Sequence, residues 1–140
     1  MKHIIFVLFL VSWCFCCEND TVMAPSLQIK PLVGVWKLSE FLIIDGSEKR
    51  WQAVPYHQEN DIEIRPDGVI LDYKHKGICC HPKELRVNGS IELVNNIGKI
   101  PENTDCNTSC VKCQVWTIEH IEGQMILTQC LETDVKKYIR

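Results

Sequence analysis

The stretch DIEIRPDGVILDY, residues 61–73, decides the fold class. Charged and apolar residues alternate over 61–65, which is the period-two pattern of a β-strand with one buried face. Pro66, Asp67 and Gly68 follow as a turn signal, and the apolar run 69–73 then leads the chain back. This stretch therefore predicts two strands joined by a tight turn.

The same unit recurs along the chain, and no convincing helical period appears beyond position 30. Further strands are predicted over 35–44, 51–56, 85–87, 90–94, 114–121, 124–131 and 135–139, with turn pairs at Asp45-Gly46, Asn88-Gly89 and Glu122-Gly123. Sequential hairpins with short turns favour a meander, and closing a meander removes its open edges. We expect an all-β domain, a small up-and-down antiparallel barrel of about eight strands.

The N-terminus has a different composition. Lys2 and His3 precede an apolar run over 4–13, which has the length of a secretory signal's apolar region and is too short to span a bilayer comfortably. The following cysteines resemble the end of a bacterial lipoprotein signal, because Cys17 follows a small residue, Cys16, and precedes the acidic tract Glu18-Asn19-Asp20. The alternative is that all three cysteines are cut off with the signal.

This resemblance implies the following organisation. Residues 1–16 are a lipoprotein-type signal peptide, Cys17 carries the lipid, 17–30 form a flexible tether, and 31–140 form the barrel domain. The expected location is the cell envelope, as an outer-membrane or surface lipoprotein. Removing 1–16 takes away Lys2 and no acid, leaving 14 basic against 18 acidic residues. Without a basic patch we expect no nucleic-acid partner, and we expect a monomer.

The first predicted strand opens with LVGVWKL, residues 32–38. Gly34-x-Trp36 resembles the signature of the lipocalin and fatty-acid-binding superfamily, in particular its compact bacterial lipocalin-like lipoproteins. The resemblance implies that Trp36 plugs the closed end of the barrel, that Gly34 permits close backbone approach, and that Arg140 from the last strand packs over the tryptophan.

A lipocalin-like barrel has room for packed side chains or for one small ligand. The predicted lining consists of Trp36, Leu38, Leu42, Ile62, Ile64, Leu71, Tyr73, Leu93, Trp116, Ile118 and Leu127. Glu40 falls on the inward face if no bulge intervenes. We expect a non-catalytic protein that binds a small apolar molecule; the alternative is a filled barrel without a ligand.

Six cysteines follow Cys17, at positions 79, 80, 106, 110, 113 and 130, and an even count in an exported domain predicts disulfides. Cys113 and Cys130 bracket a predicted hairpin, and Cys79 or Cys80 could tie the loop that holds Cys106 and Cys110. Two alternatives remain: a zinc site made by four of Cys79, Cys80, His81, Cys106, Cys110 and Cys113, or a Cys-rich interaction loop over 77–82 and 95–113. No histidine, serine or carboxylate spacing indicates an enzyme, and no cofactor is expected.

Overall fold

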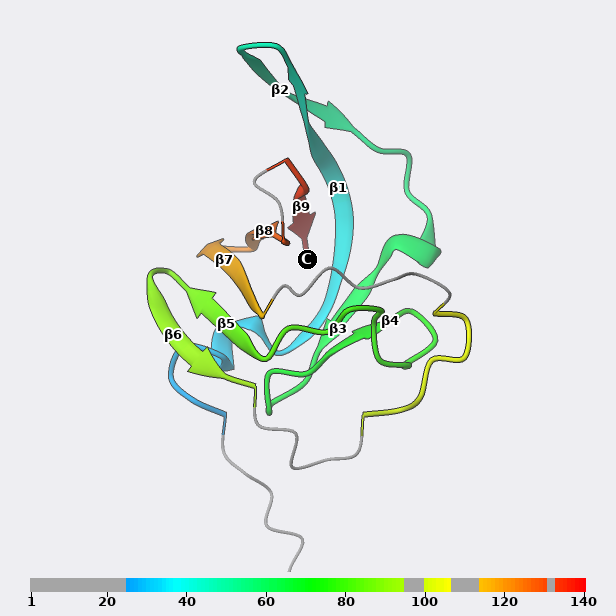
Figure 1. The fold of residues 1–140 in the computed structure, drawn as a ribbon, viewed down its shortest axis with the longest axis vertical. Coiled ribbons are helices and arrows are strands. Elements are labelled where there is room, and N and C mark those ends of the chain that lie inside the picture. The colour runs from blue at the N-terminus through cyan, green and yellow to red at the C-terminus, as the bar shows by residue number, and fades with distance from the viewer. Residues whose placement is uncertain (1–24, 95–99, 107–113, 131–132) are drawn as a thin grey trace, which may run out of the picture.

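The structure, a computed structural model, describes residues 25–94, 100–106, 114–130 and 133–140 (Figure 1). These residues form an all-β domain with two short 3-10 turns, η1 (Lys30–Leu32) and η2 (Gln58–Asn60). The described strands are β1 (Gly34–Asp45), β2 (Glu48–Ala53), β3 (Ile62–Ile64), β4 (Ile70–Asp72), β5 (Glu84–Val87), β6 (Ser90–Leu93), β7 (Val115–Ile121), β8 (Gln124–Thr128) and β9 (Val135–Ile139). The predicted all-β class and the predicted hairpins are confirmed.

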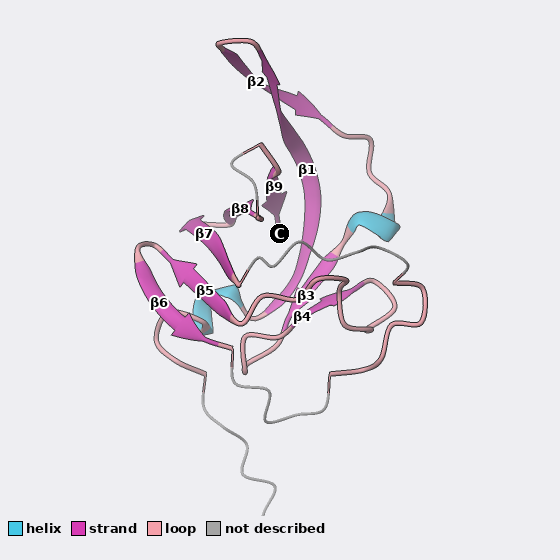
Figure 2. Ribbon diagram, viewed as in Figure 1, coloured by secondary structure: helices cyan, strands magenta, loops and turns pink. Residues whose placement is uncertain are grey.

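All nine strands belong to one sheet, and Figure 2 shows how it curls. The strand order is β4-β3-β1-β9-β8-β7-β5-β6, and β2 pairs with the second half of β1. The long strand β1 pairs with β3 over 34–36, with β9 over 37–41 and with β2 over 40–45. The β1–β2 hairpin therefore extends beyond the rest of the sheet (Figure 1).

The strand order corrects the expectation of a purely antiparallel, up-and-down barrel. Strand β7 pairs in parallel with β5, with Glu84 opposite Val115 and Val87 opposite Ile118. Parallel neighbours need a crossover of a dozen or more residues, and residues 94–114 between β6 and β7 supply it. The long segment that the sequence shows after the Asn88-Gly89 hairpin carries the chain across β5.

The described sheet also has two edges, β4 and β6, where a closed barrel has none. Side chains cover the gap between the β3–β4 turn and the β5–β6 hairpin. A Cβ atom added at Gly68 would lie 3.8 Å from side-chain atoms of Ile29, Leu85 and Val94. These three residues come from the N-terminal segment, β5 and the residue after β6, so side chains from these segments pack around the β3–β4 turn.

A single hydrophobic core fills the inside of the curl. Its buried members are Ile29, Leu32, Trp36, Ile62, Ile64, Ile70, Leu85, Val87, Trp116, Ile118, Met125, Leu127 and Tyr138. Ile29 is only 4% exposed, so the domain begins within the predicted tether 17–30. Residues 1–24, including Cys17 and the signal region, lie outside the described residues.

Candidate functional site

The interior was the first candidate site, and seven of the predicted lining residues are indeed buried. Trp36, Ile62, Ile64, Leu71, Trp116, Ile118 and Leu127 are between 0% and 9% exposed. A side chain that bordered a void large enough for water would keep surface accessible to water, and these keep almost none. The described part of the interior is therefore filled by its own side chains.

The other four predicted lining residues are not fully buried in the core. Leu93 is 67% exposed on β6. Leu42 is half-buried in the β1–β2 hairpin opposite Trp51, and Leu38 is partly buried against the core. Half-buried Tyr73 lines a surface pocket.

The face of Leu71 is set by the register of β3 against β4. Ile64 lies opposite Ile70, and Glu63 lies opposite Leu71. Since opposed residues share a face, Ile70 joins Ile64 in the core while Leu71 takes the outer face. Because residues 69–71 are all apolar, the sequence there does not show which of them face the core, and a register shift of one residue exchanges the two faces.

The floor of the curl is built around Trp36. Its indole Nε1 donates to the carbonyl oxygen of Leu32 at 2.7 Å, and its ring is fully buried. The guanidinium of Arg140 stacks over this ring with Cζ 4.3 Å from the centroid, and Arg140 Nη2 donates to the carbonyl of Val33 at 2.6 Å. Gly34 has φ +121°, a conformation that side chains rarely adopt. These contacts hold the start of β1 against Arg140, the residue that follows β9.

Glu40 marks a β-bulge and does not reach the interior. The register between β1 and β9 shifts between Leu38 and Glu40. The Glu40 carboxylate receives a hydrogen bond from Lys137 Nζ at 2.7 Å. That lysine also lies 4.3 Å from the Trp51 ring centroid. The bulge thus ties the base of the protruding hairpin to the last strand.

The second candidate site is a loop surface, which we call the stapled loop and define as residues 72–82 and 100–106. Its two parts are joined by a disulfide between Cys79 and Cys106. This bond confirms that one of the vicinal cysteines 79 and 80 ties the loop holding Cys106. Cys80 and Cys130 are also disulfide-bonded. Cys110 and Cys113, and with them the predicted Cys113–Cys130 pairing, lie outside the described residues.

Main-chain and side-chain hydrogen bonds reinforce the disulfide. The Gly77 N–H donates to the Pro101 carbonyl at 2.9 Å. Asn103 Nδ2 donates to the Gly77 carbonyl at 3.0 Å and to Asp72 Oδ2 at 3.2 Å. A Cβ atom at Gly77 would lie 2.4 Å from Ile100 Cγ2, so only glycine allows the two parts to approach this closely.

Asp72 organises the turn at the start of the stapled loop. Its Oδ1 accepts the backbone N–H groups of Lys74 and Lys76, each at 2.9 Å. His75, between these two lysines, has φ +58°, and Cys80 has φ +60°. Non-glycine residues in this region are uncommon and cost conformational energy. The loop thus holds two unfavourable backbone positions through an extensive set of contacts.

His81 anchors the stapled loop to the core strand β4. Its Nε2 accepts the N–H of Ile70 at 3.2 Å, while Nδ1 lies 2.7 Å from the Pro82 carbonyl. These contacts fit a neutral ring with its proton on Nδ1. Burial lowers the pKa of His81, and nearby Arg65 acts in the same direction, while the Pro82 carbonyl and Asp67 oppose the shift.

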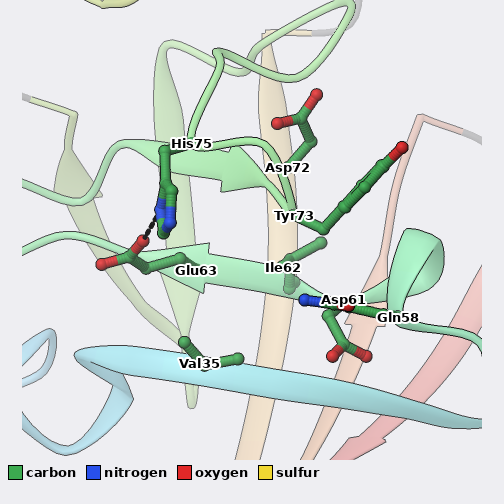
Figure 3. A pocket seen from close by; sticks show the side chains of 8 residues that line it. All are labelled: Val35, Gln58, Asp61, Ile62, Glu63, Asp72, Tyr73 and His75. Atoms are coloured by element: carbon green, nitrogen blue, oxygen red, sulfur yellow. Dashed lines mark hydrogen bonds and ion pairs between the residues drawn. The ribbon is translucent and has the colours of Figure 1, made fainter.

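A small pocket lies beside the stapled loop, where η2, β1, β3 and β4 meet (Figure 3). Its volume is about 100 Å³, and it is lined by Val35, Gln58, Asp61, Ile62, Glu63, Asp72, Tyr73 and His75. Sites for small molecules usually measure about 300–1,000 Å³. Its carboxylates also serve the fold: Glu63 Oε2 lies 2.7 Å from His75 Nδ1, and Asp61 Oδ2 accepts from the Tyr56 hydroxyl.

The exposed side of the stapled loop carries charges of both signs. Lys74 and Lys76 lie 3.6 Å and 3.8 Å from the Asp105 carboxylate, whose side chain is 65% exposed. Exposed pairs of this kind contribute little to stability. Asp72, Asn103 and His81 were missed as organising residues because their roles depend on contacts between distant segments.

In the described ranges no three metal-ligating side chains gather, and the disulfide removes Cys79 and Cys106 as thiolate ligands for zinc. Within the same ranges no helix is long and apolar enough to cross a bilayer. No protein-family model, curated protein or solved structure matches this chain.

Proposed function

We propose that this protein is an exported, lipid-anchored envelope protein whose filled, lipocalin-like domain binds a protein partner through the stapled loop. The proposal assigns it no catalytic role. The observation that carries it is the Cys79–Cys106 disulfide, which fixes an irregular, exposed loop onto a packed β-scaffold. Loops held by a rigid scaffold are where binding residues concentrate in proteins.

Binding at a surface accounts for the interior better than the carriage of an apolar molecule. The residues that would line a cavity instead pack against one another, with Trp36, Ile64 and Ile118 at 0% exposure. An apolar ligand of ordinary size would need several of these side chains to leave the core. A flat or shallow loop surface needs no such rearrangement.

The contacts around Trp36, at the floor of the curl, support the lipocalin-like assignment. Arg140 packs over the Trp36 ring, and Gly34 two residues earlier has a positive φ. The Gly-x-Trp resemblance implies this arrangement. The parallel β5–β7 pairing and the open edges at β4 and β6 depart from the regular pattern of that superfamily. Membrane attachment through Cys17 is supported by the sequence around it alone.

The partner can be found and mapped with a photo-cross-linking side chain placed at Lys74, whose side chain is 48% exposed. The same group at exposed Glu119 on β7 provides the matched control. We expect a protein adduct from position 74 only. The purified partner should then bind the protein with at least tenfold lower affinity when Asp105→Lys is introduced, and within twofold of the parent with Glu119→Lys. Equal cross-linking at 74 and 119, or no loss with Asp105→Lys, would contradict the assignment to the stapled loop.

A further inference from the structure

Three strongly exposed apolar side chains lie on two segments at one end of the domain. Leu27, in the N-terminal segment, is 88% exposed. Leu93 and Ile91 on the edge strand β6 are 67% and 57% exposed. Because residues two apart on a strand share a face, Ile91 and Leu93 point the same way.

The two segments run side by side. The Ile29 and Val94 side chains both lie 3.8 Å from the point that a Cβ at Gly68 would occupy. Leu27 is two residues before Ile29, and Leu93 directly precedes Val94. Figure 1 shows the start of the described chain passing along β6, at the end of the molecule opposite the β1–β2 hairpin.

Three basic residues lie on the same segments as these apolar residues or next to them. Lys30, Lys83 and Arg86 are all exposed, and Arg86 lies directly opposite Ile91 in the β5–β6 pairing. None of the three forms an ion pair within the described part of the chain. Glu84 lies opposite Leu93, and Glu92, between Ile91 and Leu93, lies opposite Leu85 and so takes the other face of β6. Lys30, Lys83, Arg86 and Glu84 are therefore the charged residues to consider on the outer side. These four charged residues together carry two net positive charges.

The covalent chain places this face close to the proposed anchor. Eight residue steps separate Cys17 from Pro25, where the described chain begins. Fully extended, eight residues span at most about 28 Å, which is less than the width of a domain of this size, on the order of 35 Å. The side of the domain nearest to Pro25 is thus the side nearest to the bilayer.

From the exposed apolar residues, the exposed cations and the short connection to Cys17, we propose that this face lies on the membrane. We call it the membrane face: Leu27, Ile91 and Leu93 with Lys30, Lys83 and Arg86. The inference depends on the proposed lipid anchor. The apolar side chains enter the headgroup region and the cations meet anionic lipid headgroups. The β1–β2 hairpin then projects away from the bilayer.

The test uses the full processed protein in vesicles of 70% phosphatidylcholine and 30% phosphatidylglycerol that contain a photoactivatable lipid. Mass spectrometry measures the label on the tryptic peptide 87–99, which contains Ile91 and Leu93, against peptide 51–74, which contains exposed Trp51 and Tyr56. We expect at least fivefold more label on 87–99. Leu27→Ser should reduce that label at least threefold, whereas Ile121→Ser, an equally drastic change at a 72% exposed position, should leave it unchanged.

The intact mass of the same sample separates the two proposals. If Cys17 carries acyl groups and the two peptides are labelled equally, the membrane face is wrong while the anchor stands. If Cys17 carries no acyl group, the proposed anchor is wrong. The unacylated chain is then added to the same vesicles, and the labelling of the two peptides is compared again. Equal labelling in that experiment, or β6-mediated dimers that shield 87–99, would overturn the membrane face as well.

Discussion

Truncating Leu127 tests whether the domain is filled. Leu127 is 1% exposed on β8, and it lies opposite fully buried Ile118 on β7. Leucine-to-alanine changes in packed cores cost about 3–5 kcal/mol, because the lost transfer energy adds to the energy of the cavity that remains. In a solvent-filled barrel, the same change would remove surface that water already touches and would cost less than about 1 kcal/mol.

Leu93→Ala is the matched control. Both leucines were predicted to line the barrel, but Leu93 is 67% exposed. Urea unfolding without reductant, followed by tryptophan fluorescence, measures both variants. With a slope of about 1.5 kcal/mol per molar urea, Leu127→Ala should lower the midpoint by about 2–3 M, and Leu93→Ala by no more than about 0.3 M. Similar shifts for the two leucines would refute the filled core.

Three further predictions concern the staple, the histidine anchor and the floor. The Cys79→Ser/Cys106→Ser variant should lose at most about 3.5 kcal/mol of unfolding free energy, the loop entropy for a separation of 27 residues; a loss below about 0.5 kcal/mol in urea unfolding would show that the staple is dispensable. Because burial lowers the pKa of His81, the histidine contributes stability above the unfolded pKa near 6.5 that is lost as pH falls. His81→Gln, which keeps an acceptor near the Nε2 position, should flatten the stability profile between pH 7 and 5, and an unchanged profile would exclude the role. Arg140→Ala should cost about 1 kcal/mol by removing the cation from the Trp36 ring, with Arg140→Lys intermediate; thermal unfolding measures both, and identical midpoints for all three proteins would contradict the stacking.

Local features of the fold were predictable from the sequence. Asn88-Gly89 and Glu122-Gly123 have the turn chemistry that hairpins require, and both occur where the structure places them. The start of β1 was also predictable. Gly34 allows an unusual backbone conformation, and Trp36 provides a large side chain that favours burial. In each case the signal and its structural consequence lie within a few residues.

Features that depend on distant segments were not predictable. Nothing near Val115 indicates that β7 will lie beside β5 rather than β6, since strand order depends on pairing between segments that are distant in the sequence. The outer face of Leu71 follows from a register that the whole β3–β4 pair sets. The stapled loop likewise depends on contacts such as Asn103 with Asp72, across 31 positions of sequence.

Native mass spectrometry of the protein, extracted gently from its own membranes, tests the central claim most directly. We predict a chain that begins at Cys17 with acyl groups, carries a protein partner and releases no small molecule on activation. The Asp105→Lys variant, extracted in the same way, should lack the partner and keep the mass of the acylated chain. A small apolar molecule that remains bound to the isolated chain would contradict the filled core and restore the carrier function.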